Sequence, residues 1–247
     1  ETHDVCLLMK HIDEIEPFYE VTSLRARSLP FHPSWKDLRF LELFPNTRSL
    51  TILDRKYCKE DEAKPLIFDG IQNCPDLEVV LSDCLMVPPI LSGIEYCTKL
   101  TKFIIAVFYG DNRPTDITPL SELSFLRNIG VYSVHGIGHG LVETNGLDLS
   151  ECTSLYDLSI HPTSKDLRFL GSVQLCSLDA ASSGIESLDG LDTTKLVELD
   201  VRDNRIACIE ILRGAKLRQA KSCRLEGNPI DPKVLREITD SWISRDD

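Results

Sequence analysis

The sequence predicts an α/β solenoid, a curved parallel β-sheet whose strands come one by one from successive repeats. Apolar residues recur every 20 to 29 residues along most of the chain, and within each period they alternate with polar ones. HPSWKDLRFL at 32–41 and HPTSKDLRFL at 161–170 also match at eight of ten positions. A unit of this size cannot bury its apolar side alone, so neighbouring units must stack.

Composition narrows the classes of protein and partner. The 247 residues are 42% hydrophobic and 27% charged, which excludes a disordered tail, a collagen and a coiled coil. The chain has 39 acidic and 27 basic residues, and its net charge of −12 argues against nucleic-acid and anionic-membrane partners. No segment approaches the roughly 18 apolar residues of a membrane span, and the first thirty residues lack a signal-peptide pattern. We therefore expect a soluble chain.

The clearest repeat runs from Leu196 to Ile206. Its sequence, LVELDVRDNRI, resembles the leucine-rich-repeat segment LxxLxLxxNxL at every defining position. The resemblance covers about residues 23 to 231 and implies a leucine-rich-repeat solenoid of the SDS22-like or internalin-like subclass, degenerate in its middle repeats. The predicted first positions of nine repeats are Ala26, Leu50, Leu77, Leu100, Leu126, Leu155, Leu175, Leu196 and Ala220.

The segments between the strands are similar to the return limbs of that subclass. ITPLSELSFL at 117–126 and IESLDGLDTTKL at 185–196 imply short 3₁₀ turns, and the longer repeats have room for a helical turn or two. The family's asparagine at position 9 is kept at Asn204 and Asn228 alone, which predicts an irregular ladder in the middle repeats.

Both ends of a solenoid need a cap. Asp231 and Pro232 are typical of a helix start, and the apolar spacing that follows predicts a C-terminal capping helix at 231–243. The spacing of apolar residues between Val5 and Ile15 favours a helical N-terminal cap, or else a strand of a tenth repeat. We expect a cap at 1–22, repeats at 23–230, and the capping helix with its tail at 231–247.

The nine cysteines are too few for a disulfide-stapled scaffold, and their number is odd. Cys74, Cys97 and Cys152 each stand three residues before a leucine, which predicts buried, reduced thiols in one structural slot. With no Cys-x-x-Cys pair and no glycosylation acceptor, we expect a cytoplasmic protein without a metal site. A secreted or cell-surface recognition domain is the alternative.

Residues 135–140, HGIGHG, suggest a phosphate loop or a histidine metal pair. No lysine follows, and no third ligand is adjacent, so a flexible connector is the preferred interpretation. The sequence also lacks a nucleophile elbow or a catalytic cysteine signature. We predict no catalytic residue and no cofactor.

Two sets of outward strand positions are the candidate partner-binding residues. The first predicts an apolar patch, unless a shift of phase or the N-terminal segment covers it: Ile52, Tyr57, Val79, Leu81, Ile104, Ala106 and Val107. The second is acidic with aromatic neighbours, and suits a basic protein unless it is merely a solvated face: Tyr132, Tyr156, Asp157, His161, Asp179, Glu198, Asp200 and Asp203.

A basic cluster stands near the last repeat. A helix-like stretch at 213–220 with solvated basic residues is the preferred interpretation, with a second docking point for an acidic partner as the alternative; the five basic residues are Arg213, Lys216, Arg218, Lys221 and Arg224. Taken together, these features predict a noncatalytic scaffold that binds a protein on its concave face. A regulator or inhibitor that occludes a partner enzyme is the alternative, because the resembled subclass includes a phosphatase regulator and bacterial adhesins.

Overall fold

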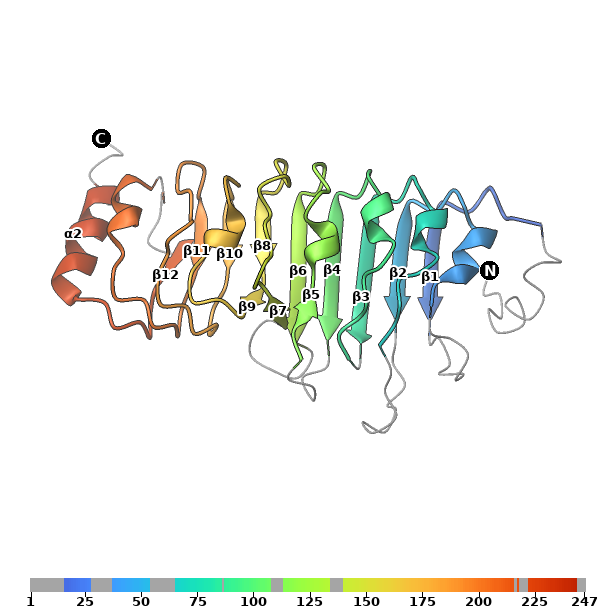
Figure 1. Cartoon of the computed structure of the whole chain (residues 1–247). Coiled ribbons are helices and arrows are strands. Elements are labelled where there is room, and N and C mark those ends of the chain that lie inside the picture. The colour runs from blue at the N-terminus through green and yellow to red at the C-terminus, as the bar shows by residue number, and fades with distance from the viewer. Residues whose placement is uncertain are drawn as a thin grey trace.

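The computed structural model describes residues 16–27, 37–53, 65–85, 87–107, 113–133, 140–215, 217 and 222–243. Within these residues, nine strands form one parallel sheet, in which each strand pairs with the strand of the next repeat (Figure 1). The strands are β1 (Ser23–Arg27), β2 (Ser49–Leu53), β3 (Val79–Leu85), β4 (Lys102–Val107), β6 (Asn128–Ser133), β8 (Asp157–Ser159), β10 (Ser177–Asp179), β11 (Glu198–Asp200) and β12 (Cys223–Arg224).

A smaller parallel sheet lies beside the middle repeats. It contains β5 (Thr115–Asp116), β7 (Leu141–Glu143) and β9 (His161–Pro162), in that order. The ladder is also irregular nearby, because the register between β3 and β4 shifts between Ser82 and Leu85. Irregularity in the middle repeats is what the loss of the position-9 asparagine predicts.

The limb at 185–196 contains turns and no 3₁₀ helix, so the prediction is wrong there, but 117–126 and other return limbs carry 3₁₀ turns as the resemblance implies. They are η2 (Arg39–Leu43), η4 (Ile71–Asn73), η5 (Ile94–Tyr96), η6 (Thr118–Leu120), η7 (Arg168–Leu170) and η8 (Glu210–Gly214). The described parts of the two similar decapeptides, 37–41 and 166–170, both enter a 3₁₀ turn. Asp37 Oδ1 accepts the Arg39 amide at 3.2 Å, and Asp166 Oδ1 accepts the Arg168 amide at 3.1 Å, so each aspartate fixes the first residue of its turn.

The sheet register fixes the phase of every repeat. One row of paired residues runs across all nine strands: Leu24, Leu50, Val80, Phe103, Ile129, Leu158, Leu178, Leu199 and Cys223. Each lies three residues after the first position of its repeat, which confirms the predicted phase from the third repeat to the ninth. The predicted first positions of the first and second repeats are wrong.

In those two repeats the first positions are Val21 and Thr47, not Ala26 and Leu50. Thr47 is fully buried in a slot that most other repeats fill with leucine. Because a polar residue occupies that slot, the apolar pattern starts at Leu50, and counting from it shifts the phase by three residues.

The core is one continuous apolar layer between the sheet and the limbs. Leu199 and Val201 are 1% and 0% exposed, so positions 4 and 6 of the clearest repeat point inward as predicted. The same layer extends from Phe40 near one end to Trp242 at the other. Stacking thus buries in each unit the side that the unit cannot bury alone.

The C-terminal end is closed by helix α2 (Pro232–Ile243), which lies beyond β12 in Figure 1. Asp231 Oδ1 accepts the Lys233 amide at 2.7 Å, so the aspartate caps the helix as the sequence predicts. Ile238 is fully buried, and Trp242 Nε1 donates to the Leu212 carbonyl at 3.1 Å. These contacts fasten the helix to the last limb.

At the N-terminal end, Phe18 stacks on Phe44 with ring centroids 5.4 Å apart. The predicted helix between Val5 and Ile15 lies outside the described residues. Among the helices that the structure describes, none has both the length and the apolar character of a bilayer span.

Candidate protein-interaction surface

Strand side chains alternate between the core and what we call the outer face, the side of the nine-stranded sheet opposite the core. In β4 the half-buried Lys102, Ile104 and Ala106 alternate with buried Phe103, Ile105 and Val107. The outer face therefore carries positions 3, 5 and 7 of the longer strands, and positions 3 and 5 of the shorter ones.

This alternation corrects two predicted binding residues. Ile52 is 1% exposed, because the corrected phase places it at the inward position 6. Val107 is 6% exposed, because β4 continues for six residues and its alternation carries position 8 into the core. Tyr57 lies outside the described residues.

The remaining four residues of the first set lie beside Tyr132 of the second set. We use the name apolar patch for Val79, Leu81, Ile104, Ala106 and Tyr132, all half-buried on the outer face of β3, β4 and β6. Leu81 pairs with Ile104, and Ala106 pairs with Tyr132. Residues paired on neighbouring parallel strands are about 4.8 Å apart, so these side chains form one contiguous surface.

Tyr132 lies back along its own strand over Gly130. A Cβ built on Gly130 would stand 2.6 Å from Cε2 of the Tyr132 ring, so only glycine leaves room for the ring in this position. Glycine in a strand lowers the free energy of unfolding by about 0.5 to 1 kcal/mol relative to alanine. An aromatic ring that covers the glycine shields its backbone from solvent. Sequence analysis identified Tyr132 but missed the role of Gly130.

The acidic residues continue along the same rows of the sheet. Asp157, Asp179, Glu198 and Asp200 lie on β8, β10 and β11, and Asp179 pairs directly with Asp200. Asn128 Nδ2 donates to Asp157 Oδ2 at 2.9 Å, which ties the acidic rows to the end of the apolar patch. The outer face thus brings together five residues of the second predicted set: Tyr132, Asp157, Asp179, Glu198 and Asp200.

Asp200 is a structural ion-pair centre and not a free acid. Arg202 approaches its Oδ2 at 2.8 Å and Arg224 at 3.3 Å, while the carboxylate side chain is only 13% exposed. Burial alone would raise the pKa of Asp200, but hydrogen bonds from Arg202 and Arg224 and the charge of Arg202 outweigh it and leave the pKa below its ordinary value. Its charge is therefore largely compensated within the molecule.

Two further predicted residues lie off the main rows. His161 is half-buried in β9 of the smaller sheet and pairs there with Leu141. Asp203 is exposed in the turn after β11, with a positive φ of 55°.

The residues directly before β8, β10 and β11 form an apolar strip. Tyr156 and Val197 are 45% and 46% exposed, and Cys176 lies between them. The Tyr156 carbonyl accepts the Cys176 amide at 2.8 Å, and the Cys176 carbonyl accepts the Val197 amide at 2.8 Å. Sequence analysis missed Val197, although its position, just after the first leucine of a clear repeat, matches that of Tyr156.

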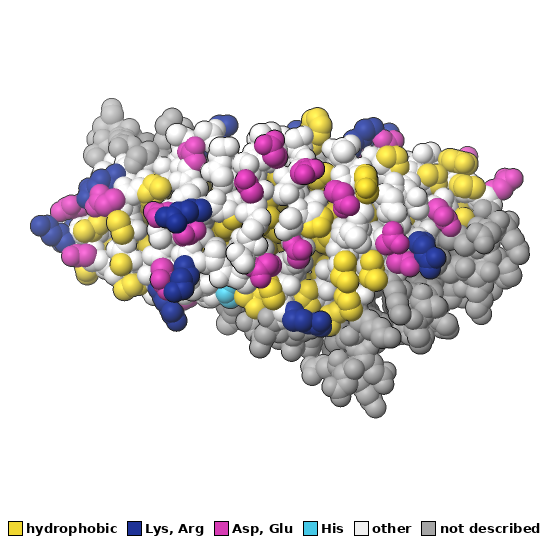
Figure 2. Space-filling view, in the orientation of Figure 1, with side chains coloured by type: hydrophobic (Ala, Val, Ile, Leu, Met, Phe, Trp, Pro, Cys, Tyr) yellow, Lys and Arg dark blue, Asp and Glu magenta, His cyan; other side chains and the backbone are white. Residues whose placement is uncertain are grey.

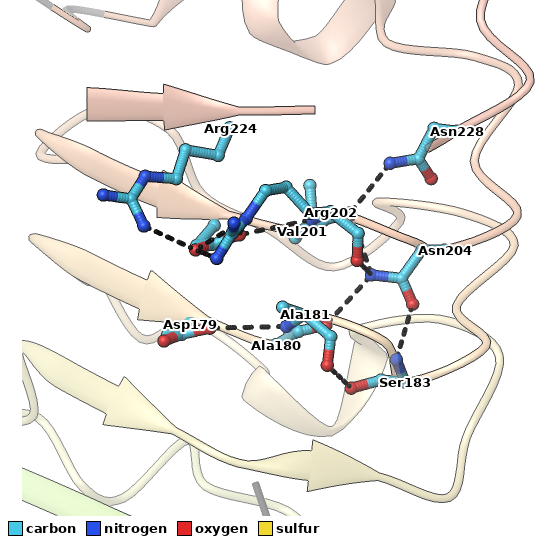
Figure 3. A network of polar contacts seen from close by, with 10 residues as sticks. Asp179, Ala180, Ala181, Ser183, Val201, Arg202, Asn204, Arg224 and Asn228 are labelled. Carbon is cyan, nitrogen blue, oxygen red and sulfur yellow. Dashed lines mark hydrogen bonds and ion pairs between the residues drawn. The ribbon is translucent and has the colours of Figure 1, made fainter. Parts of the chain in front are cut away.

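The turns behind β10 to β12 are held by an asparagine ladder (Figure 3). Asn204 Oδ1 accepts the amides of Ser183 and Ile185 at 2.9 and 3.0 Å, and its Nδ2 donates to the Ala180 carbonyl at 2.9 Å. Asn228 Nδ2 likewise donates to the Val201 carbonyl of the preceding repeat at 2.8 Å. The ladder fixes the spacing of the strands that present Asp179 and Glu198.

In the sixth repeat, a threonine replaces the position-9 asparagine. Thr163 stands at position 9 of its repeat, and its Oγ1 accepts the Thr144 amide at 3.1 Å and donates to Glu143 Oε1 at 3.0 Å. Thr144 Oγ1 in turn accepts the Ser164 amide at 2.9 Å. Hydroxyls join fewer groups than a carboxamide does, because they are shorter and have one donor.

The described part of the basic cluster is engaged in ion pairs. Arg213 lies in η8 and bonds to Glu210 and to Glu237, the latter at 3.4 Å. Arg224 lies on β12 and contacts Asp200. Arg213 lies in the predicted helix-like stretch at 213–220, within η8, while Lys216, Arg218 and Lys221 lie outside the described residues.

The cysteine slot is buried as predicted. Cys74, Cys97 and Cys152 are each 0% exposed, and their Sγ atoms donate to backbone carbonyls, as Cys152 does to Leu120 at 3.3 Å. Burial raises the pKa of the Cys152 thiol to about 11, which keeps it protonated at neutral pH. Within the described residues, no three His, Cys, Asp or Glu side chains are arranged to hold a metal ion, and 134–139 lie outside them.

Comparison with known proteins finds structural similarity but no match in sequence. No protein-family model and no curated protein sequence matches the chain. An internalin from Listeria monocytogenes is similar in structure, with 19% identity and a TM-score of 0.43. The similarity covers 84% of this chain and 48% of the internalin, so this chain spans about half of that protein's length.

The fold is leucine-rich-repeat-like. The observation that decides it is the combination of one parallel strand per repeat, inward residues at positions 4 and 6, and Asn204 and Asn228 at position 9 bonding to the preceding repeat.

Proposed function

We propose that the chain is a noncatalytic protein-binding scaffold and that its partner contacts the outer face of the nine-stranded sheet. The observation that carries the proposal is the apolar patch. Side chains such as Leu81 and Ile104 occupy outward strand positions, where a solvated sheet normally carries polar residues. A contiguous apolar surface of this kind is typical of an interaction site.

A rigid sheet suits this function. The strands are tied by backbone ladders and by the asparagine contacts, so little conformational freedom is lost when a partner docks. The short 3₁₀ limbs support assignment to the SDS22-like or internalin-like subclass. We also propose a cytoplasmic location. Counting free thiols in the unreduced protein tests it, since all nine cysteines free would favour the cytoplasm and one or three would favour secretion.

The experiment compares two pairs of variants in affinity capture with cross-linking. Leu81→Ser with Ile104→Ser changes the apolar patch, whereas Tyr96→Ser with Phe125→Ser removes exposed apolar side chains, 64% and 61% exposed, from the return limbs. We expect the first pair to lose the captured protein and the second pair to keep it. Equal capture by both pairs would contradict the proposed surface.

A further inference from the structure

The outer face changes character along its length, in an order fixed by the sheet. From β3 to β12 the position-5 row reads Leu81, Ile104, Gly130, Ser159, Asp179, Asp200 and Arg224, and it begins with Arg25 on β1 and Thr51 on β2. With strands about 4.8 Å apart, Ile104 and Asp179 are three strands and about 14 Å apart. An apolar half and an acidic half are thus separated by a short stretch of small residues.

The middle of this row is covered in part by an aromatic ring. Gly130 has no side chain, its place is taken by the Tyr132 ring, and Ser159 beside it is small. Large side chains stand on both sides, with Leu81 and Ile104 before this stretch and Asp179 after it. A bound polypeptide that crosses the strands therefore contacts the Tyr132 ring between the apolar and the acidic half.

The charges beyond each half restrict where a basic group can lie. On the apolar half, Lys102 on β4 pairs with Val79 and with Asn128 and repels a cation. Beyond β11, Arg202 and Arg224 are 42% and 55% exposed around the compensated Asp200. The outer-face carboxylates that attract a cation lie on β8, β10 and the start of β11; they are Asp157, Asp179, which also interacts with the charge of Arg202, and Glu198.

Acidic side chains alone do not single out this site. The view in Figure 2 shows magenta acidic residues spread along the molecule, with dark-blue basic residues more frequent toward the C-terminal end. What distinguishes the outer face is that its carboxylates follow an apolar patch in a fixed direction and at a fixed distance. Specificity arises from such paired features more than from net charge.

We infer that the outer face binds a protein segment in one orientation across the strands. Apolar side chains of the segment pack on Leu81, Ile104 and Tyr132, and its lysine or arginine side chains lie over Asp179 and Glu198. The inference rests on the proposed function and adds the chemistry of the partner segment. It excludes acidic segments, because the carboxylates of β10 and β11 repel them.

The test uses a random 20-residue peptide library displayed on phage and selected against the full chain. Selected peptides are synthesised and their affinities measured by fluorescence anisotropy. We expect sequences that combine a Leu, Ile or aromatic cluster with a Lys or Arg cluster. Their affinity should fall at least tenfold both with Leu81→Ser plus Ile104→Ser and with Glu198→Lys, and should weaken as salt rises.

Matched controls separate position from net charge. Glu122→Lys changes the charge equally in the turn after η6, and we expect it to alter the affinity less than twofold. Asp200 is left unchanged, because its replacement would release two arginines. Exchanging the peptide's basic residues for Glu should abolish binding to the native chain and restore it to the chain with Asp179→Lys and Glu198→Lys. Restoration requires that these side chains meet directly.

The outcomes distinguish the two proposals. Peptides that depend on Leu81 and Ile104 but are acidic, or are indifferent to Glu198→Lys, would overturn the inference and keep the proposed function. Peptides indifferent to both outer-face changes, or the absence of any selected peptide, would contradict the proposed function as well.

Discussion

Replacing Asn204 by alanine tests the ladder that holds the C-terminal strands in place. The side chain is buried, accepts the amides of Ser183 and Ile185, and donates to three carbonyls that include those of Ala180 and Val201. Two N–H donors serve three carbonyls, so the side chain contributes about four full bonds. At about 1 kcal/mol of net stability each, the variant should lose about 3 to 4 kcal/mol of unfolding free energy.

The assay is urea unfolding followed by circular dichroism and by the fluorescence of the buried Trp242. Asn228→Ala is the matched control. That side chain is less buried and makes three bonds, to Ile206, Val201 and Leu225, so we expect a loss of about 2 to 3 kcal/mol. A loss below about 1 kcal/mol for Asn204→Ala, or a larger loss for Asn228→Ala, would refute the reasoning.

Three further changes have definite expected results. Burial raises the pKa of the Cys97 thiol to about 12 from 9.0, so the unfolded chain loses this proton first and the unfolding free energy should fall as pH rises above 9. Cys97→Ala should flatten this fall in urea titrations. Asp200→Asn should destabilise the fold at neutral pH and flatten its acid dependence. The lowered pKa of Asp200 contributes stability above the ordinary value of 3.8, and this is lost as pH falls through the lower folded value. Ser82→Ala should raise the unfolding free energy by about 1 kcal/mol, because no described residue hydrogen-bonds the buried Ser82 Oγ. An unchanged or lower melting temperature would contradict this.

The clear repeats show how far sequence patterns reach. From Leu77 onward the apolar spacing predicted the phase of each strand, because leucine, isoleucine or valine occupies most of the slots that the sheet must bury. The spacing also predicted the position and cap of α2, since Asp231 and Pro232 are local signals. These features depend on residues that are close together in the sequence.

The remaining features depend on contacts between repeats. Thr47 occupies a slot that is usually leucine, so the apolar pattern does not mark the start of the second repeat. The phase of that repeat was therefore wrong, and so was the predicted exposure of Ile52. Asp200 counted as a free acid in the sequence, but Arg202 contacts it two residues along the chain, and Arg224 reaches it only after β11 and β12 pair. Gly130 acquires its role because Tyr132, two residues later on the same side of the strand, lies over it.

The most direct test of the account is hydroxyl-radical footprinting of the full chain with and without a selected peptide, read residue by residue by mass spectrometry. If the outer face is the interaction surface, Leu81, Ile104 and Tyr132 become protected while Tyr96 and Phe125 on the return limbs stay reactive. Protection of Tyr96 and Phe125, with the three outer-face residues unchanged, would contradict it.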